Sequence, residues 1–363
     1  MKRIAAVATM SCALVAALLA LQPATFAQKP RVKCGSKAAT IVGTPRADEL
    51  VGTSGPDVIV GLGGDDQIRA RGGRDLVCGG EGFDNVTGGA DHDRLKGGAG
   101  DDFLGGGPGR DRLEGEKGVD VLFGGPGNDL LLAGSNNAPF PVEALVGGPG
   151  DDHLDGGRGL DSAQFFDASQ GIVADLTTDT ATGEGSDELL RIEGVVGSNF
   201  DDVIVGDDTT NGLFGQEGDD QLLGLGSGDL ASGKWDLLSG DDGADDILGG
   251  DGFDMVTYDR IPVPVTVDLA AGVATGQGED TLQSTEGAWG SRLDDVLIGN
   301  PSDNAFIGGF GNDDMDGGSG TDTAIFRSDP GPVVADLSSD SASGTGLDVL
   351  TGFENLWGSG GSD

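Results

Sequence analysis

The sequence predicts an all-β fold, a parallel β-roll or β-solenoid, on three observations. Glycine supplies 70 of the 363 residues, whereas aromatic residues make up only 5%. Ten nine-residue units follow one another without a gap from Gly43 to Leu132, and further units recur toward the C-terminus. Three segments interrupt this rhythm, each spanning 41 residues between equivalent aspartates. A short fixed period of this kind is the sequence signature of stacked coils.

The ten units share Asp at position six and an aliphatic residue at position eight, and the full pattern GGxGxDxUx, in which U is aliphatic, is unaltered in GGAGDDFLG at 97–105 and GGPGNDLLL at 124–132. Glycine at positions one, two and four permits the positive φ angles of a tight turn. Residues seven to nine predict a three-residue strand whose middle side chain points inward. Two units therefore make one coil of about eighteen residues, and stacked coils form two parallel sheets with a thin aliphatic core between them.

The charge of the chain favours cations as ligands. Aspartate and glutamate outnumber lysine and arginine by 62 to 21, a formal net charge of −41 at pH 7, which excludes nucleic acid as a natural partner. Position six is Asp in all ten consecutive units, and stacking brings each of these carboxylates beside the one two units away. Such carboxylates repel one another unless a hard cation with six to eight oxygen ligands lies between them. Calcium suits turn carbonyls better than magnesium does.

The repeat resembles the RTX or hemolysin-type calcium-binding nonapeptide repeat, and the resemblance covers nearly all of residues 43–363. It implies a parallel β-roll with calcium between successive turns, the position-six Asp as side-chain ligand and turn carbonyls completing the shell. The predicted calcium ligands are Asp57, Asp66, Asp75, Asp84, Asp93, Asp102, Asp111, Asp120, Asp129, Asp152, Asp161, Asp202, Asp220, Asp229, Asp245, Asp254, Asp295, Asp313 and Asp322.

Some units depart from the pattern, and for them a metal site is not predicted. GDDTTNGLF and GNPSDNAFI carry Asn211 and Asn304 at position six. The unit GKWDLLS is two residues short, although Asp236 stays in phase. Residues 133–146 do not fit the pattern and predict a loop.

The three interruptions predict strand excursions that leave the roll and rejoin it, at 165–196, 258–289 and 326–363. They separate three β-roll arrays, at 43–164, 197–257 and 290–325. Each excursion holds an aromatic residue, a degenerate unit with Asp at position six and then a Glu: Phe165, Asp187 and Glu193; Tyr258, Asp280 and Glu286; Phe326, Asp348 and Glu354. A ligand-binding loop is the alternative interpretation. The third excursion ends inside a turn at Asp363, and a truncated C-terminus is one interpretation of this ending.

The first 27 residues predict a signal peptide. Lys2 and Arg3 form a basic start, residues 4–21 form an apolar run, and small residues lead to a cleavage site after Ala27. An uncleaved membrane anchor is the alternative, because about 18 apolar residues just span a bilayer. We therefore expect a secreted, extracellular protein with no stable membrane insertion once the signal is removed.

Two cysteines, Cys34 and Cys78, remain after signal removal. In an exported protein they predict a disulfide, and two free thiols are the alternative. The segment between Cys34 and a strand at 40–42 extends about 3.3 Å per residue, which is long enough to bring Cys34 to Cys78. The bridge would then hold an N-terminal cap, residues 28–42, on the open end of the roll, where unpaired strand edges need cover.

No catalytic motif is evident, and the protein is not predicted to be an enzyme. His92 and His153 fall at variable repeat positions, no HExxH motif occurs, and GxGxxG strings arise from the repeat without a following helix. The main functional prediction is a secreted protein whose folding depends on calcium. The alternatives are a surface adhesin or matrix protein with a cell-surface or glycan partner, a hydrolase or epimerase on an outer sheet face, and ice binding.

Overall fold

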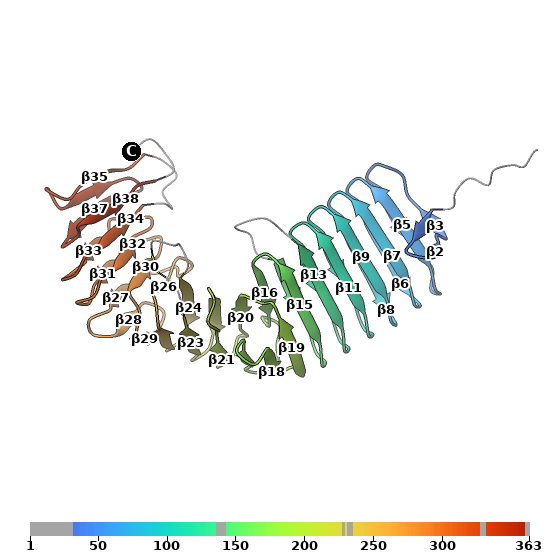
Figure 1. The fold of residues 1–363 in the computed structure, drawn as a ribbon, viewed down its shortest axis with the longest axis horizontal. Helices are drawn as coiled ribbons and strands as arrows, with labels where there is room; N and C mark the ends of the chain where they lie inside the picture. Colours follow the sequence, from blue (N-terminus) through green and yellow to red (C-terminus); the bar gives the residue numbers. More distant parts are fainter. Residues whose placement is uncertain (1–31, 136–142, 227–228, 231–234, 327–331, 360–363) are drawn as a thin grey trace, which may run out of the picture.

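The computed structural model describes residues 32–135, 143–226, 229–230, 235–326 and 332–359. Within these ranges it consists of strands and turns that stack into an elongated, curved roll (Figure 1). None of the described segments is a helix long and apolar enough to cross a membrane. The predicted signal peptide, residues 1–27, lies outside the described residues.

One sheet, here called sheet I, runs through the roll without a break. Its 15 described strands are all parallel, and successive members are joined in register, for example Ile68 to Val86 and Val86 to Leu104. In order they are β4 (Glu49–Val51), β6 (Gln67–Gly72), β8 (Asn85–Ala90), β10 (Phe103–Gly105), β12 (Val121–Phe123), β14 (Glu143–Val146), β16 (Asp161–Gln164), β20 (Gly194–Val196), β22 (Gly212–Glu217), β24 (Asp236–Asp242), β26 (Asp254–Thr257), β30 (Gly287–Trp289), β32 (Ala305–Ile307), β34 (Thr323–Ile325) and β38 (Asn355–Trp357).

The opposite sheet, sheet II, consists of three blocks of parallel strands. The first block holds β3 (Ile41–Val42), β5 (Val58–Gly63), β7 (Leu76–Glu81), β9 (Arg94–Ala99), β11 (Arg112–Lys117), β13 (Leu130–Ser135), β15 (His153–Arg158) and β19 (Ser186–Leu190). The second holds β21 (Val203–Val205), β23 (Gln221–Leu225), β25 (Asp246–Gly250) and β29 (Glu279–Gln283). The third holds β31 (Val296–Ile298), β33 (Asp314–Asp316) and β37 (Leu347–Thr351).

Each excursion inserts antiparallel strands into sheet II. In the first one, β18 (Thr180–Thr182) pairs antiparallel with both β19 and β17 (Val173–Asp175), and β17 then pairs parallel with β21 of the next block. The equivalent pairs are β27 (Thr266–Asp268) with β28 (Val273–Thr275) and β35 (Val334–Asp336) with β36 (Ser341–Ser343). Sheet I closes over each insertion, because β16 pairs directly with β20 and β26 with β30. The predicted all-β roll with three excursions is confirmed.

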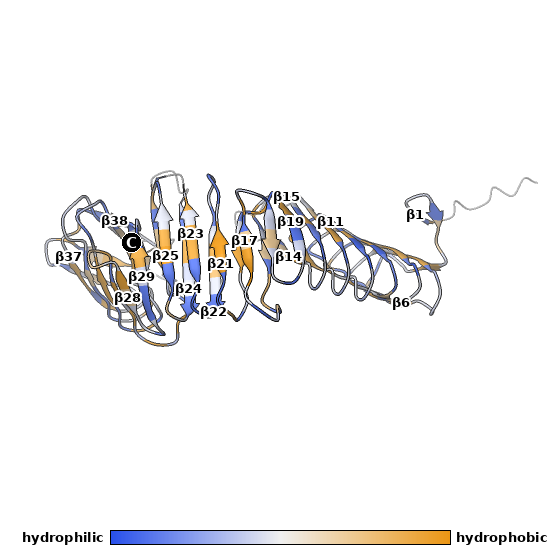
Figure 2. Ribbon diagram, turned by 90° about the horizontal axis from the view of Figure 1, so that it is seen from below, coloured by the Kyte–Doolittle hydropathy of each residue, from blue (hydrophilic) through white to orange (hydrophobic). Residues whose placement is uncertain are grey.

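The core is a double column of the aliphatic side chains at position eight. Ile68, Leu104 and Leu122 from sheet I and Leu95 and Leu113 from sheet II are completely buried. Figure 2 shows hydrophobic residues along the strands and hydrophilic residues at the turns. In the regular coils each strand adds one side chain to this thin core, so few aromatic residues are needed, and the excursions add further core residues such as Phe165, Tyr258 and Phe326.

Tryptophan side chains pack on a second, smaller cluster. Met255, Ile307 and Ile325 are buried outside the main core, and Trp289 and Trp357 pack against them. Met255 and Ile325 flank core residues along their strands, and neighbouring side chains of a strand point to opposite faces, so this cluster lies on the outer face of sheet I. The two tryptophans therefore have a packing role.

The loop predicted at 133–146 is wrong at both ends. Strand β13 continues to Ser135, and β14 begins at Glu143 and pairs in register with β12 and β16. Glu143 therefore stands at position six of a unit, and counting back from it in the sequence gives 138–146, APFPVEALV. Ala138, Pro139 and Pro141 stand at positions one, two and four, where the pattern has glycine, so the sequence pattern does not reveal the unit.

A disulfide ties the N-terminal hairpin to the first coils. Cys34 in β1 (Lys33–Cys34) is bonded to Cys78 in β7, with the two Cα atoms 5.7 Å apart. Strand β1 pairs with β2 (Lys37–Ala38) and contacts β5 and β7, and Cys34 is completely buried. The hairpin thereby lies at the end of sheet II, as a cap would.

Removal of the disulfide is expected to loosen this end of the roll. The double substitution Cys34→Ser with Cys78→Ser should cost about 2–4 kcal/mol and raise amide hydrogen exchange in β3 and β5. Coils of a solenoid contact only their neighbours, so exchange in β31 and β33 should be unchanged. An equal rise in both regions would show that the bridge does not act locally.

Candidate metal-binding turns

The position-six aspartates form two ladders, one beside each sheet. The carboxylate folds back into its own turn, and its Oδ1 accepts a hydrogen bond from the backbone N–H of the position-six residue one coil earlier. Thus the N–H of Asp66 donates to Asp84 (2.9 Å) and that of Asp84 to Asp102 (2.8 Å), each 18 residues on. The ladders place one carboxylate, or the amide of Asn211 or Asn304, at successive coils along each edge of the roll.

Ladder I precedes the strands of sheet I, and ladder II precedes the strands of sheet II. Ladder I contains Asp48, Asp66, Asp84, Asp102, Asp120, Glu143, Asp161, Glu193, Asn211, Asp236, Asp254, Glu286, Asn304, Asp322 and Glu354. Ladder II contains Asp57, Asp75, Asp93, Asp111, Asp129, Asp152, Asp187, Asp202, Asp220, Asp245, Asp280, Asp295, Asp313 and Asp348. Every predicted ligand except Asp229 stands in one of them.

Asp229 does not take the place predicted for it. Its side chain is exposed, and the N–H of Asn211 donates instead to Asp236 Oδ1 (2.8 Å). A Cβ added to Gly224 would lie 2.8 Å from Asp236 Oδ2, which identifies Gly224 as position one of this turn. The turn is longer than the pattern allows, so counting nine residues from Gly224 selects the wrong aspartate.

The excursions supply ladder residues that the sequence analysis did not count as ligands. The N–H groups of Asp152 and Asp245 donate to Asp187 and Asp280 in ladder II. In ladder I the N–H groups of Asp161, Asp254 and Asp322 donate to glutamates, at 3.0, 3.1 and 2.9 Å. The acceptors are Glu193, Glu286 and Glu354. At each excursion a glutamate thus takes the place of the position-six aspartate in ladder I.

The second carboxylate oxygen is the notable feature of most ladder aspartates. It is buried and has no hydrogen-bond partner among the described residues in Asp66, Asp75, Asp84, Asp93, Asp102, Asp111, Asp120, Asp129, Asp152, Asp161, Asp220, Asp236, Asp245, Asp254, Asp313 and Asp322. In Asp161 and Asp254 both oxygens are in this state. We call the turns of these residues open turns. A buried charge without a partner costs several kcal/mol. A row of such carboxylate oxygens therefore indicates that these turns bind a positive ligand.

Burial raises the pKa of these carboxyl groups and so disfavours their charged form while no cation is present. Desolvation raises the pKa of Asp84 to about 6, of Asp102 to about 7 and of Asp220 to about 8, although a backbone N–H donates to each. By contrast, the N–H of Thr53 lowers the pKa of Asp57 below its ordinary value. A cation in the open turns would hold their carboxylates in the charged form.

The donors present fit a hard cation such as calcium. Within the described ranges no three carboxylate, imidazole or thiol side chains converge on one point, so main-chain carbonyls must supply part of the shell. Calcium accepts mixed carboxylate and carbonyl oxygens in flexible geometry. The turns keep such oxygens close: a Cβ added to Gly106 would lie 2.5 Å from Asp111 Oδ2 and 2.7 Å from the carbonyl oxygen of Gly124.

The raised pKa values predict that acid stabilises the calcium-free roll. The folded state keeps protons on the open-turn aspartates up to about pH 7, whereas the unfolded chain releases them near pH 4. The folded state binds more protons in this window, so its stability should fall as pH rises from about 4 to 8. Circular dichroism of chelator-treated protein should show more β structure at pH 5 than at pH 8. A signal independent of pH would contradict the prediction.

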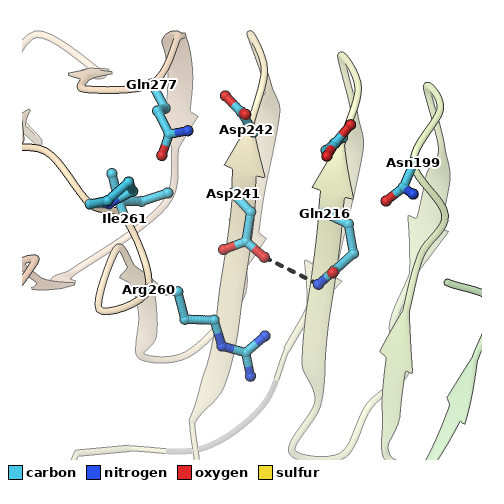
Figure 3. Close-up of a pocket in the computed structure, with 9 residues that line it drawn as sticks. Asn199, Gln216, Asp241, Asp242, Arg260, Ile261 and Gln277 are labelled. Atoms are coloured by element: carbon cyan, nitrogen blue, oxygen red, sulfur yellow. Dashed lines mark hydrogen bonds between the residues drawn. The ribbon is translucent and has the colours of Figure 1, made fainter.

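Two hollows lie on the roll, and they differ in their relation to the ladders. One, of about 260 Å³, is lined by polar residues of β22 and β24 together with Arg260 and Gln277 (Figure 3). In it Gln216 donates to Asp241 (3.3 Å), and Arg260 stacks on Phe214. None of its lining residues is a ladder residue.

The other hollow, of about 520 Å³, lies on the first array. Its lining combines basic side chains, among them Arg74, Arg94 and Arg110, with the ladder II carboxylates Asp75, Asp93 and Asp111. Of the two histidines, His92 lines this hollow and accepts the N–H of Arg110 (2.7 Å), while His153 lies 2.7 Å from Glu188. In this hollow basic side chains therefore lie beside three open turns of ladder II.

The repeat pattern is shared with a known family. The RTX calcium-binding nonapeptide repeat (4 copies) matches residues 42–77, 79–113, 105–137, 143–163, 236–256 and 289–324. These matches include the open turns from Asp66 to Asp161, the ladder position of Asp236, and Asp313 and Asp322. The comparison with curated proteins found no match to the chain. RTX nonapeptide repeats bind calcium, and with this pattern repeated along both ladders the chain belongs to the RTX calcium-binding nonapeptide-repeat proteins.

Proposed function

We propose that this is a secreted protein whose β-roll folds when calcium occupies its open turns. The observation that carries the proposal is the row of buried carboxylate oxygens without partners along both ladders. The N-terminal pattern of residues 1–27 supports export, and extracellular calcium-binding modules work at about 10⁻⁴–10⁻³ M calcium. The same chain would stay expanded at the low calcium concentration inside a cell.

Charge explains why calcium would control folding. The chain carries a net charge of −41, and the roll gathers a large share of its carboxylates into two lines. Each bound divalent ion removes repulsion and relieves the burial cost of the carboxylates beside it. Metal-binding free energy therefore becomes folding free energy.

Calorimetric titration of the full chain with calcium tests this function. Calcium should bind at several sites per chain, with a change in circular dichroism over the same concentration range. Magnesium should bind more weakly, because it prefers a tight octahedral shell and retains its waters. The function would be refuted if the chain bound no calcium at millimolar concentration, or if its circular dichroism did not change when calcium bound.

A role without catalysis is part of the proposal. Both histidines lie near the surface and contact an arginine backbone or a glutamate, and neither stands beside a serine or cysteine nucleophile in the described hydrogen bonds. We assign no catalytic centre to the outer sheet faces.

A second candidate function is adhesion to an anionic glycan, and the basic hollow of the first array favours it. Arg74, Arg94 and Arg110 take part in none of the ion pairs within the described residues. Neighbouring parallel strands lie about 4.8 Å apart, so these side chains present closely spaced positive charges on an otherwise acidic protein.

Binding to an immobilised acidic polysaccharide tests the second function. Substitution of Arg74, Arg94 and Arg110 by Gln should abolish binding at low salt. Substitution of the exposed Arg46, Arg158 and Arg292 by Gln changes the net charge equally and should leave binding intact. Equal losses in the two variants would exclude the hollow as the binding surface.

A further inference from the structure

Six ladder positions differ from the open turns because their turns are closed by internal hydrogen bonds. In the turn of Asp57, the N–H and hydroxyl of Thr53 donate to Oδ2 at 2.7 and 2.9 Å. In the turn of Asp202, the N–H of Ser198 donates to Oδ2 at 2.5 Å. The same position-two to position-six bond occurs from Thr44 to Asp48, Asp207 to Asn211, Ser291 to Asp295 and Asn300 to Asn304. We call these capped turns.

Backbone conformation separates the two kinds of turn. In open turns the position-two residue has positive φ even where it is not glycine, as in Leu62 (88°), Arg71 (82°) and Glu116 (77°). Its N–H then points to the next coil, as that of Gly107 does to the carbonyl of Gly124 (2.9 Å). In the capped turns no position-two residue has positive φ. In a capped turn the N–H of position two therefore donates to the position-six side chain and not to a carbonyl of the next coil.

In capped turns the position-two side chain also holds the turn together by a hydrogen bond, where open turns rely on glycine. Its oxygen accepts the N–H of position four, from Gly55 to Thr53 and from Phe200 to Ser198, at 3.1 and 3.2 Å. This is the local hydrogen bond that Ser, Thr, Asp and Asn form in turns. Residue type alone does not decide the outcome, because Asp241 at position two has φ of 69° and Asp245 in its turn is open.

The capped turns occur in pairs at the start of each array. Asp48 and Asp57 begin the first array, Asp202 and Asn211 follow the first excursion, and Asp295 and Asn304 follow the second. Each pair contains one rung of ladder I and one of ladder II. A coil that starts an array thus has both of its turns capped.

The excursions explain this position. Asp202 and Asp295 accept the N–H of Ile172 and Val265, which belong to excursions and not to glycine turns (both 2.7 Å). A cation between turns needs carbonyl oxygens from two consecutive turns. At the first coil of an array one of those turns is missing, so the carboxylate must be satisfied from within its own unit.

We propose that the capped turns bind no calcium, so that each array begins with a metal-independent coil and calcium is confined to three separate blocks of open turns. The first block runs from Asp66 to Asp161, the second from Asp220 to Asp254, and the third holds Asp313 and Asp322. This rests on the proposed calcium function and adds which of the repeated aspartates serve it. The capped coils need no metal, and the first open turn of each block is assembled on them.

Isosteric substitutions distinguish the two kinds of turn in the full chain. One variant carries Asp57→Asn, Asp202→Asn and Asp295→Asn, all in capped turns. The matched variant carries Asp75→Asn, Asp220→Asn and Asp313→Asn, each in the open turn that follows along the same ladder. Calorimetry should give the capped-turn variant the wild-type number of calcium ions per chain. The open-turn variant should lose at least one ion for each substituted turn.

The reverse change provides a second test that does not depend on removing charge. Asn211→Asp with Asn304→Asp adds two carboxylates to capped turns and should add no bound calcium. If the open-turn variant does not fold, the single substitutions Asp57→Asn and Asp75→Asn make the same comparison. A wild-type chain that binds no calcium would refute the proposed function. Equal loss of calcium from capped and open variants would refute only the division proposed here.

Discussion

Chelation of calcium at neutral pH is expected to remove most of the β structure of the roll. Without the ion, each open turn would bury an oxygen such as Asp102 Oδ2 with no partner. A cost of several kcal/mol for each such group exceeds what the strand after that turn gains by burying its one aliphatic side chain, about 1.5–3 kcal/mol. Far-ultraviolet circular dichroism before and after chelator measures the change.

Readdition of calcium should restore the spectrum, and readdition of the same concentration of sodium should not. The sodium arm separates specific occupation of the turns from general screening of charge. A spectrum that does not change on chelation would mean that the ladders are stable as bare carboxylates.

The substitution Phe306→Ala is expected to have the largest effect of any single core change. Phe306 is completely buried in β32 and lies in register between Ala288 and Ala324, with Phe353 6.0 Å away between ring centroids. Its ring fills the volume that the two alanines leave. Removal should cost about 3–5 kcal/mol, seen as a lower denaturant midpoint of the third array in saturating calcium.

Phe310→Ala is the matched control, because this ring belongs to the next unit but is 45% exposed. It should change stability by less than about 1 kcal/mol. Similar losses in the two variants would mean that the core column is not the source of stability in this array.

Much of the fold follows from the repeat itself. Ten uninterrupted units fix which residue points inward, and stacking of coils then places Asp66 beside Asp84 without further information. The excursions also follow, because their degenerate units keep Asp187 and Asp280 at position six, where the N–H groups of Asp152 and Asp245 reach them.

What could not be predicted depends on local geometry that the pattern does not contain. The pattern predicts Asp229 as the ligand in place of Asp236, because the turn that begins at Gly224 is longer than the nine-residue unit allows. Glu143 was missed because its unit lacks glycine. The capped turns cannot be read from the pattern, because the φ angle of the position-two residue, such as Thr53 or Ser198, decides whether its N–H reaches the carboxylate. The pattern specifies a residue type at position two and not its φ angle.

Crystals of the calcium-loaded protein, measured for anomalous scattering from calcium, test the central claim most directly. Peaks are predicted about 2.3–2.6 Å from Oδ2 of open-turn residues such as Asp84, Asp102 and Asp220. No peak is predicted at Asp57 or Asp202. Ladders whose Oδ2 atoms turn to solvent, with no anomalous peak along either edge of the roll, would contradict the account.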